Sequence, residues 1–116
     1  MRLKGAMIFV LDLPRQEAFY SGVLGFKAVE QTRQQDWVEF DAGGAGFSLH
    51  AIPAHIAAGI TPSDAPREQH PVKLTFEVED VDTEVARLEG LGVRIIRRPW
   101  GAYDGVDPEG NVFGIG

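Results

Sequence analysis

The sequence predicts an α+β protein in which two βαβββ modules follow one another along the chain. Three observations lead to this prediction. Most of the apolar runs are short and strand-like, with β-branched or aromatic residues. Two longer segments have helical periodicity, and each lies between a capping aspartate and a terminating glycine. Fourteen glycines and seven prolines are typical of many short elements joined by tight turns.

The first half begins with an apolar run, residues 6–11, that is too short for a helix and predicts a strand. Asp12 can cap a following helix, because its carboxylate can accept from the free N–H groups of the first turn. Gly25 is placed to end this helix in a left-handed conformation. Three strands should follow, with the glycine-rich segment 43–46 as a turn before the last: residues 26–31, 36–41 and 47–52.

The segment from 53 to 71 has four prolines and no sustained period. It is too long for a simple turn, so we expect a connector, a lid or crossover, that contains one helical turn at residues 54–58. This divides a single domain, residues 1–116, into module one (1–52), the connector, and module two (72–116).

Module two repeats the opening pattern. Strict alternation predicts a half-buried strand over residues 72–78, with its apolar positions toward the helix. Asp80 or Asp82 should cap the next helix, and Gly92 should end it. The apolar face of that helix is Val81, Val85, Leu88 and Leu91. A strand at 93–97, a corner at 99–101 and a hairpin turn at 107–111 complete the chain.

The two halves can be overlaid on each other. Val10 matches Val78 at an offset of 68 residues, and Gly25 matches Gly92 at an offset of 67. Any two strand–helix–strand units look broadly alike, but here the capping aspartate and the terminating glycine coincide as well as the apolar positions. We therefore interpret the pattern as an internal duplication.

Composition excludes several classes of function. Eleven Lys and Arg against seventeen Asp and Glu give a net charge of −6 and a pI of about 4.9, which disfavours a nucleic-acid partner. The absence of cysteine excludes disulfides, zinc ribbons, iron–sulfur clusters and thiol nucleophiles. No apolar run is long enough to span a membrane, and the N-terminus has no signal-peptide pattern. We therefore expect a cytoplasmic protein with no membrane partner.

The doubled pattern, together with the motifs FYSGVLGF (19–26), PWG (99–101) and DPEGNVFG (107–114), resembles the vicinal oxygen chelate superfamily. This superfamily includes glyoxalases, bleomycin resistance proteins and extradiol dioxygenases. The resemblance covers nearly the whole chain. It implies a cup formed by two curled mixed sheets with helices outside, a small-molecule ligand inside the cup, and association as a homodimer.

In the metal-dependent members of this superfamily, four strand positions hold a divalent ion. Three of these positions match Gly5, Lys73 and Gly114 of this sequence, and the fourth is best matched by His50. Glycine has no side chain to coordinate a metal, and a lysine ammonium places a cation where a cation would bind. A single histidine does not hold a hard divalent ion. We therefore expect neither a metal nor another cofactor, with a divalent metal as the alternative.

Strand alternation predicts which residues line the cup. In module two they are the polar partners of the apolar positions, and in module one the equivalent positions are apolar. Aromatic side chains are candidates for its wall or rim, although Trp37 is expected in the core. Lys73 and Glu77 are equally explained as a local ion pair. The candidate ligand-binding residues are Met7, Phe9, His50, Lys73, Thr75, Glu77, Trp100 and Tyr103.

These features favour a metal-free protein that binds a small aromatic or cationic molecule, in the manner of bleomycin resistance proteins. Net acidity favours a cationic ligand through long-range attraction. The alternative is a lyase, isomerase or dioxygenase of the same superfamily that acts on a small oxygenated substrate. Such an enzyme would use His50, Glu77 and Lys73 for acid–base chemistry, or an incomplete metal site. A purely structural paralogue is the third possibility.

Overall fold

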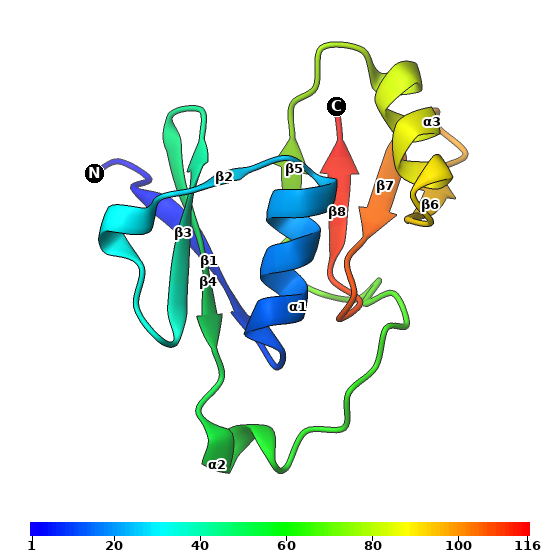
Figure 1. Cartoon of the computed structure of the whole chain (residues 1–116). Helices are drawn as coiled ribbons and strands as arrows, with labels where there is room; N and C mark the ends of the chain where they lie inside the picture. Colours follow the sequence, from blue (N-terminus) through cyan, green and yellow to red (C-terminus); the bar gives the residue numbers. More distant parts are fainter. The chain divides into compact units, whose positions relative to one another are not determined.

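A computed structural model describes all residues, 1–116, and divides the chain into two compact units, Met1–Pro62 and Ser63–Gly116. Each unit contains one four-stranded mixed sheet (Figure 1). The first sheet has the order β1-β4-β3-β2, and the second has the order β5-β8-β7-β6. The second order is therefore the first one repeated, as a duplication of a βαβββ module requires.

The strands of the first unit alternate between a buried face and an open face. In β4, Phe47 and Leu49 are buried, and in β3 Val38 and Phe40 are buried. The parallel pair β1–β4 and the antiparallel pairs β4–β3 and β3–β2 build the sheet. Its strands are β1 (Gly5–Val10), β2 (Lys27–Ala28), β3 (Trp37–Ala42) and β4 (Ala45–Ala51).

A short helix, α1 (Leu13–Glu17), continues directly into a π-helical segment, η1 (Ala18–Val23). Asp12 caps α1 as predicted, because its Oδ1 accepts a hydrogen bond from the Arg15 N–H at 3.1 Å. Tyr20 is buried, and its ring lies 5.3 Å from that of Phe47 and 6.4 Å from that of Phe40. These aromatic contacts attach the helical segment to one face of the sheet and leave the other face open.

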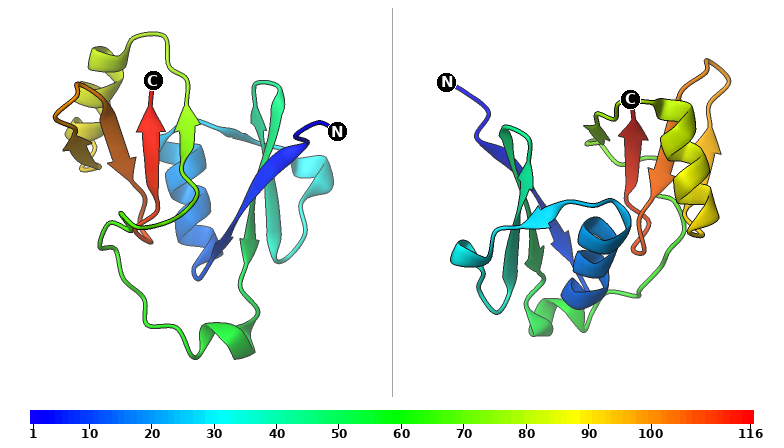
Figure 2. Two further views of the ribbon diagram at one scale, coloured as in Figure 1. Left: turned by 180° about the vertical axis from the view of Figure 1, so that it is seen from behind. Right: turned by 45° about the horizontal axis from the view of Figure 1, so that its top comes forward.

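The second unit follows the same plan, and Figure 2 shows its sheet from two further directions. β5 pairs in parallel with β8, and the β8–β7 and β7–β6 pairs are antiparallel. Phe113 and Ile115 are buried on the face toward the helix. The strands are β5 (Leu74–Phe76), β6 (Arg94–Arg97), β7 (Tyr103–Val106) and β8 (Val112–Ile115).

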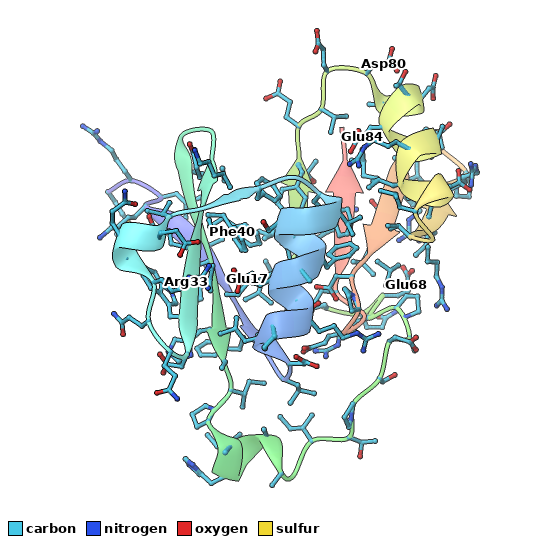
Figure 3. All side chains as sticks on the ribbon, in the orientation of Figure 1. Glu17, Arg33, Phe40, Glu68, Asp80 and Glu84 are labelled. Atoms are coloured by element: carbon cyan, nitrogen blue, oxygen red, sulfur yellow. The ribbon has the colours of Figure 1, made fainter.

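Helix α3 (Val81–Gly90) covers the sheet of the second unit. Of the two candidate caps, Asp80 is the one used, because its Oδ1 accepts from the Thr83 N–H at 2.9 Å; Figure 3 labels it at the start of the helix. Val85 and Leu88 are buried as expected, but Leu91 is 57% exposed. Leu91 lies at the C-terminal cap and not in the helix body, so it has left the apolar face.

The turn between β7 and β8 explains the residues of the DPEGN segment. Asp107 Oδ1 accepts from the N–H groups of Glu109 and Asn111, both at 2.9 Å, and its Oδ2 accepts from Asn111 Nδ2 at 2.7 Å. Gly110 has a φ of 84°, and a Cβ there would collide with the carbonyl oxygen of Ala65. The motif is therefore needed by the turn itself.

Several predicted elements are shorter in the structure. The strand expected over residues 26–31 keeps only β2, because the chain turns at once into a 3-10 segment, η2 (Glu30–Thr32). The strand expected over 72–78 keeps only β5, and Val72 is 63% exposed. In the connector, α2 (Ala54–Ala57) is the expected helical turn. None of the helices has the length and apolar character needed to cross a membrane.

Candidate functional site

The open face of the first sheet carries aromatic and polar side chains. The residues that face away from the core on adjacent strands are paired in register: Met7 with Ser48, Phe9 with His50, Trp37 with His50, and Glu39 with Ser48. Met7 is 46% exposed and Phe9 is 57% exposed. Met7, Phe9 and His50 therefore share one face, as strand alternation predicts. We call this set (Met7, Phe9, Trp37, Glu39, Ser48 and His50) the aromatic face.

Two rings are in contact at one end of the aromatic face, and a third aromatic residue lies on the neighbouring strand. The Phe9 and His50 rings have centroids 5.5 Å apart at an interplanar angle of 44°, and Trp37 is the cross-strand neighbour of His50. His50 Nδ1 lies 2.8 Å from the carbonyl oxygen of Ala51, which can only accept, so Nδ1 is the donor of this contact. The other ring nitrogen, Nε2, lies 3.8 Å from a carboxylate oxygen of Asp36. This end of the face can accept hydrogen bonds and attract positive charge.

Trp37 corrects one expectation, because it does not belong to the core. Val38 and Phe40, its neighbours along β3, are each 1% exposed and fill the buried positions, and Trp37 is only partly buried on the opposite face. The alternation Trp-Val-Glu-Phe is consistent with either face being buried. The aromatic partners of Phe40 decide between them, since Tyr20 and Phe26 both lie beside it.

The open face of the second sheet is polar. Lys73 and Thr75 lie there with Glu77, because the alternating Leu74 and Phe76 are turned toward the helix. Asp104 on β7 is 1% exposed, and its carboxylate contacts two cations. Lys73 Nζ lies 3.1 and 3.2 Å from its two oxygens, and Arg98 Nε donates to Oδ2 at 2.8 Å. The hydrogen bonds that Arg98 donates to Asp104 and Glu68 raise its pKa.

Asp104 was missed by the sequence analysis. The segment Tyr-Asp-Gly-Val has the pattern of an ordinary strand, and both partners of the aspartate lie outside β7, since Arg98 is 6 residues away and Lys73 is 31 residues away. The feature of the sequence that could have identified it is a carboxylate at a strand position that, by alternation, lies on the face away from the helix. Glu77, the partner expected for Lys73, is exposed, and the ion pair of Lys73 is with Asp104.

Tyr103 is not on the open face, which corrects a second expectation. Its hydroxyl lies 3.4 Å from an oxygen of Asp82 in helix α3, and the guanidinium of Arg97 lies over its ring at 5.7 Å. The side chain therefore lies toward the helix, one residue out of phase with Asp104. Trp100 is 74% exposed in the corner between β6 and β7, outside both sheets.

The four positions that match the metal ligands of the superfamily do not fit a divalent ion. A Cβ at Gly5 would lie 2.6 Å from the backbone oxygen of Gly46, and one at Gly114 would lie 2.6 Å from Thr75 Oγ1. His50 is level with Phe9 and not with Gly5, so four residues of strand, about 13 Å, separate it from the first position. No group of three or more His, Asp or Glu side chains could hold a metal.

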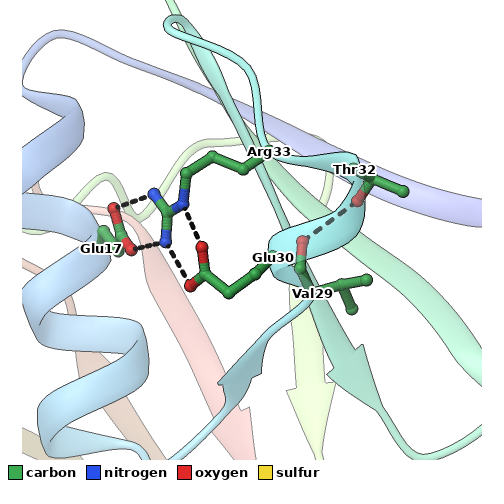
Figure 4. A network of polar contacts seen from close by, with 5 residues as sticks. All are labelled: Glu17, Val29, Glu30, Thr32 and Arg33. Carbon is green, nitrogen blue, oxygen red and sulfur yellow. Dashed lines mark hydrogen bonds and ion pairs between the residues drawn. The ribbon is translucent and has the colours of Figure 1, made fainter.

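The first unit also has an open hollow beside α1, outside the aromatic face. Arg33 crosses it and donates to Glu17 at 2.6 and 3.0 Å and to Glu30 at 2.7 and 2.9 Å (Figure 4). The hydrogen bond to Arg33 lowers the pKa of Glu30. The guanidinium of Arg33 is therefore paired with two carboxylates, and its contact with Glu17 connects η2 to α1. The hollow is lined by Leu11, Asp12, Leu13, Pro14, Glu17, Arg33, Gln34, Gln35, Asp36, Ala51, Ile52 and Ala54.

Solved structures with similar folds exist for nearly the whole chain. A glyoxalase/bleomycin resistance protein/dioxygenase family enzyme from Burkholderia phytofirmans PsJN is 26% identical, with a TM-score of 0.71, over 99% of this chain and 97% of that one. A protein of unknown function from Agrobacterium tumefaciens str. C58 is 28% identical, with a TM-score of 0.71, over 100% and 93%. Lactoylglutathione lyase from Agrobacterium tumefaciens is 24% identical, with a TM-score of 0.69, over 99% and 92%.

A search of curated proteins gave no match. The sequence itself matches one family description, "Glyoxalase/Bleomycin resistance protein/Dioxygenase superfamily", over residues 2–115. This match spans both repeats of the strand order, and the sheets have the mixed, open form that the resemblance implies. The chain belongs to the glyoxalase/bleomycin resistance protein/dioxygenase superfamily.

Proposed function

We propose that this protein binds a small aromatic or cationic molecule, without a metal, on the aromatic face of the first unit. The observation that carries the proposal is the exposed Phe9 ring, packed at 5.5 Å against His50 and followed across the sheet by Trp37. Rings at this spacing can take a planar ligand by offset or edge-to-face stacking. A cationic ligand gains further from the negative faces of the rings.

Charge on the same face favours a cation over an anion. Glu39 lies beside Ser48, and Asp36 lies next to the free nitrogen of His50. No Lys or Arg shares these register positions. A ligand N–H could donate to His50 Nε2 or to either carboxylate. The chain's net charge of −6 adds a weaker long-range attraction.

Trp37 fluorescence tests the proposal. The variant Trp100→Phe leaves Trp37 as the only tryptophan, and 1-methylquinolinium serves as a planar cationic probe, with benzyltrimethylammonium as a non-planar one. We expect saturable quenching by 1-methylquinolinium and an affinity about tenfold lower in Phe9→Ala. Leu91→Ala is the matched control, because Leu91 is 57% exposed at the C-terminal cap of α3, outside the face.

Two results would overturn the proposal. One is a linear, unsaturable response to 1-methylquinolinium in a folded protein, and the other is equal affinity in Phe9→Ala and Leu91→Ala. The metal-free part is tested separately by elemental analysis of purified protein. Zinc, nickel, manganese or iron at one ion per chain would overturn that part and favour the alternative, a lyase, isomerase or dioxygenase of the superfamily.

Association as a cytoplasmic homodimer belongs to the same proposal. The connector offers apolar surface for it, since Ile56 is 51% and Ile60 is 39% exposed. Sedimentation equilibrium over a range of concentrations tests the proposal. We expect a mass of twice 12.7 kDa, and a mass of 12.7 kDa at every concentration would overturn it.

A further inference from the structure

Asp104 holds two cations on the open face of the second sheet. Its carboxylate, with a side chain only 2% exposed, receives Arg98 at 2.8 Å and Lys73 at 3.1 Å. Burying an ionised carboxylate is unfavourable unless it is paired with a cation. Of the two partners of Asp104, only Arg98 is itself largely buried, with a side chain that is 18% exposed. Arg98 is the inner partner of this cluster, and Lys73, whose side chain is 46% exposed, is the outer one.

Lys73 reaches Asp104 across an intervening strand. It directly precedes β5, Asp104 lies on β7, and β8 runs between them. Gly114 is the residue of β8 that is opposite both Thr75 and Asp104. Because Gly114 has no side chain, no atoms project from β8 at this position, and the side chain of Lys73 can extend across the strand to the carboxylate. The ammonium is thus held in one place by a residue two strands away.

The Lys73 ammonium has an N–H group that no protein acceptor uses. A lysine ammonium has three N–H groups, and the two contacts with the oxygens of Asp104 use at most two of them. The remaining donor belongs to a side chain that is nearly half exposed. Strand alternation places Arg94 on the same face, and Arg94 has no ion-pair partner, whereas Arg98 is paired with both Asp104 and Glu68. The exposed cationic groups of Lys73 and Arg94 favour an anionic acceptor.

We propose that the Lys73 ammonium, anchored on Asp104 across Gly114, is a binding site for a carboxylate group of a small molecule. This site lies on the second unit and takes an anion, so it is distinct from the aromatic face of the first unit, which attracts cations. The ammonium donates a hydrogen bond to one carboxylate oxygen, and Arg94 adds attraction from the edge strand. Charge-assisted hydrogen bonds of this kind are stronger than neutral ones.

Benzoate is the probe for this site, and amide chemical shifts of uniformly ¹⁵N-labelled protein are the readout. We expect benzoate to shift amides of β5, β7 and β8 in a saturable way at millimolar concentrations. Lys73→Met, which keeps the chain length of the side chain without its charge, should bind benzoate about tenfold more weakly or worse. Lys27→Met on β2 is the matched control and should bind as the parent does.

A second measurement leaves the protein unaltered, in case Lys73→Met does not fold. The lysines of the chain are Lys4, Lys27 and Lys73, so their side-chain ¹⁵Nζ signals form a small, assignable set. Benzoate should shift the Lys73 signal and leave the other two in place. Benzylamine, which has the same ring with a positive charge, should shift none of them.

The proposal is overturned if benzoate moves neither the amides of the second sheet nor the Lys73 signal, or if Lys73→Met binds benzoate as well as Lys27→Met. Either result would assign Lys73 a structural role on Asp104. Failure here and failure of the aromatic face are distinguishable, because the latter is measured by quenching of Trp37 with a cation and depends on Phe9.

Discussion

Gly114 is the position where a single added methyl group should be most informative. It lies on the central strand β8, and a Cβ there would be 2.6 Å from Thr75 Oγ1, 3.2 Å from its Cγ2 and 3.3 Å from its Cβ. Of the two other staggered rotamers of Thr75, one places Cγ2 at the close position and the other places Hβ there while moving both γ atoms to new positions. The variant Gly114→Ala therefore requires Thr75 or the strand to move.

The size of the effect follows from these distances. An ordinary contact needs about 3.4 Å, so Thr75 Oγ1 must withdraw by about 0.8 Å. Overpacking of this kind costs about 1–3 kcal/mol. Replacing glycine by alanine in a strand recovers about 0.5–1 kcal/mol of backbone entropy. We expect Gly114→Ala to lower the free energy of unfolding by about 1–2 kcal/mol.

Urea unfolding of the parent protein, the two single variants and the double variant measures this prediction. Thr75→Ala removes both γ atoms, so the double variant Thr75→Ala/Gly114→Ala should recover most of the loss, with a coupling energy of about 1 kcal/mol. Gly116→Ala is the matched control on the same face. A Cβ there would meet only Thr75 Cγ2, at 3.8 Å, and stability should stay within about 0.5 kcal/mol. A neutral Gly114→Ala, or a loss that Thr75→Ala does not relieve, would refute this reasoning.

Three further predictions concern stability. Asp12→Ala should destabilise by about 1 kcal/mol in urea unfolding, because Arg15 N–H loses its acceptor, whereas Asp12→Asn should lose much less. Gly110→Ala should cost at least about 1–2 kcal/mol by the same measurement, since its φ is 84° and a Cβ would meet the Ala65 carbonyl; Gly90→Ala in α3, where nothing lies within 4 Å, should be neutral or stabilising. Hydrogen bonds lower the pKa of Asp80, Glu84 and Glu89 below the ordinary values near 4, so their stabilisation should be complete above about pH 5 and lost as pH falls through the lowered values. Urea midpoints at pH 7, 5 and 3 should show this, and a midpoint higher at pH 3 than at pH 7 would contradict it.

Local signals in the sequence predicted the elements whose determinants are also local. Asp12 and Asp80 were identified as caps because the cap and the N–H it accepts are three residues apart. Gly25 and Gly92 were identified as helix ends because a positive φ favours glycine, and both have it. The repeat of the strand order could be predicted from the spacing of these same markers.

Determinants that lie far apart in the sequence were not predicted. The strand expected at residues 26–31 is cut short where Arg33 binds Glu17, sixteen residues earlier. Trp37 was expected in the core because it is a large aromatic residue on a short strand, but which face of β3 is covered is decided by Tyr20 and Phe26 from other parts of the chain. Tyr103 was a candidate for the wall or rim of the cup as an aromatic residue, and the pairing of β7 with β8 turns it toward the helix.

The candidate site was partly predictable for the same reason. Alternation along one strand places Met7 with Phe9, and Lys73 with Thr75, without knowledge of the partners. Which residues complete each group depends on register across strands. His50 lies beside Phe9 and not beside Gly5 because of the register in which β1 and β4 pair. Asp104 can contact Lys73 because the residue of β8 opposite Asp104 is Gly114, which has no side chain.

The two units share a topology and yet present different chemistry, and glycine accounts for much of the difference. At Gly5 the close approach of Gly46 leaves no space for a side chain, so the aromatic face is built from residues further along β1. At Gly114 the missing side chain is what lets a lysine on one strand and an aspartate two strands away form an ion pair. A glutamate at position 114 would have to displace Thr75 and would lie in the path between Lys73 and Asp104. Substituting the ligand residues of metal-dependent relatives into these positions would therefore not create a metal site by itself, since Thr75 and Asp104 would also have to change.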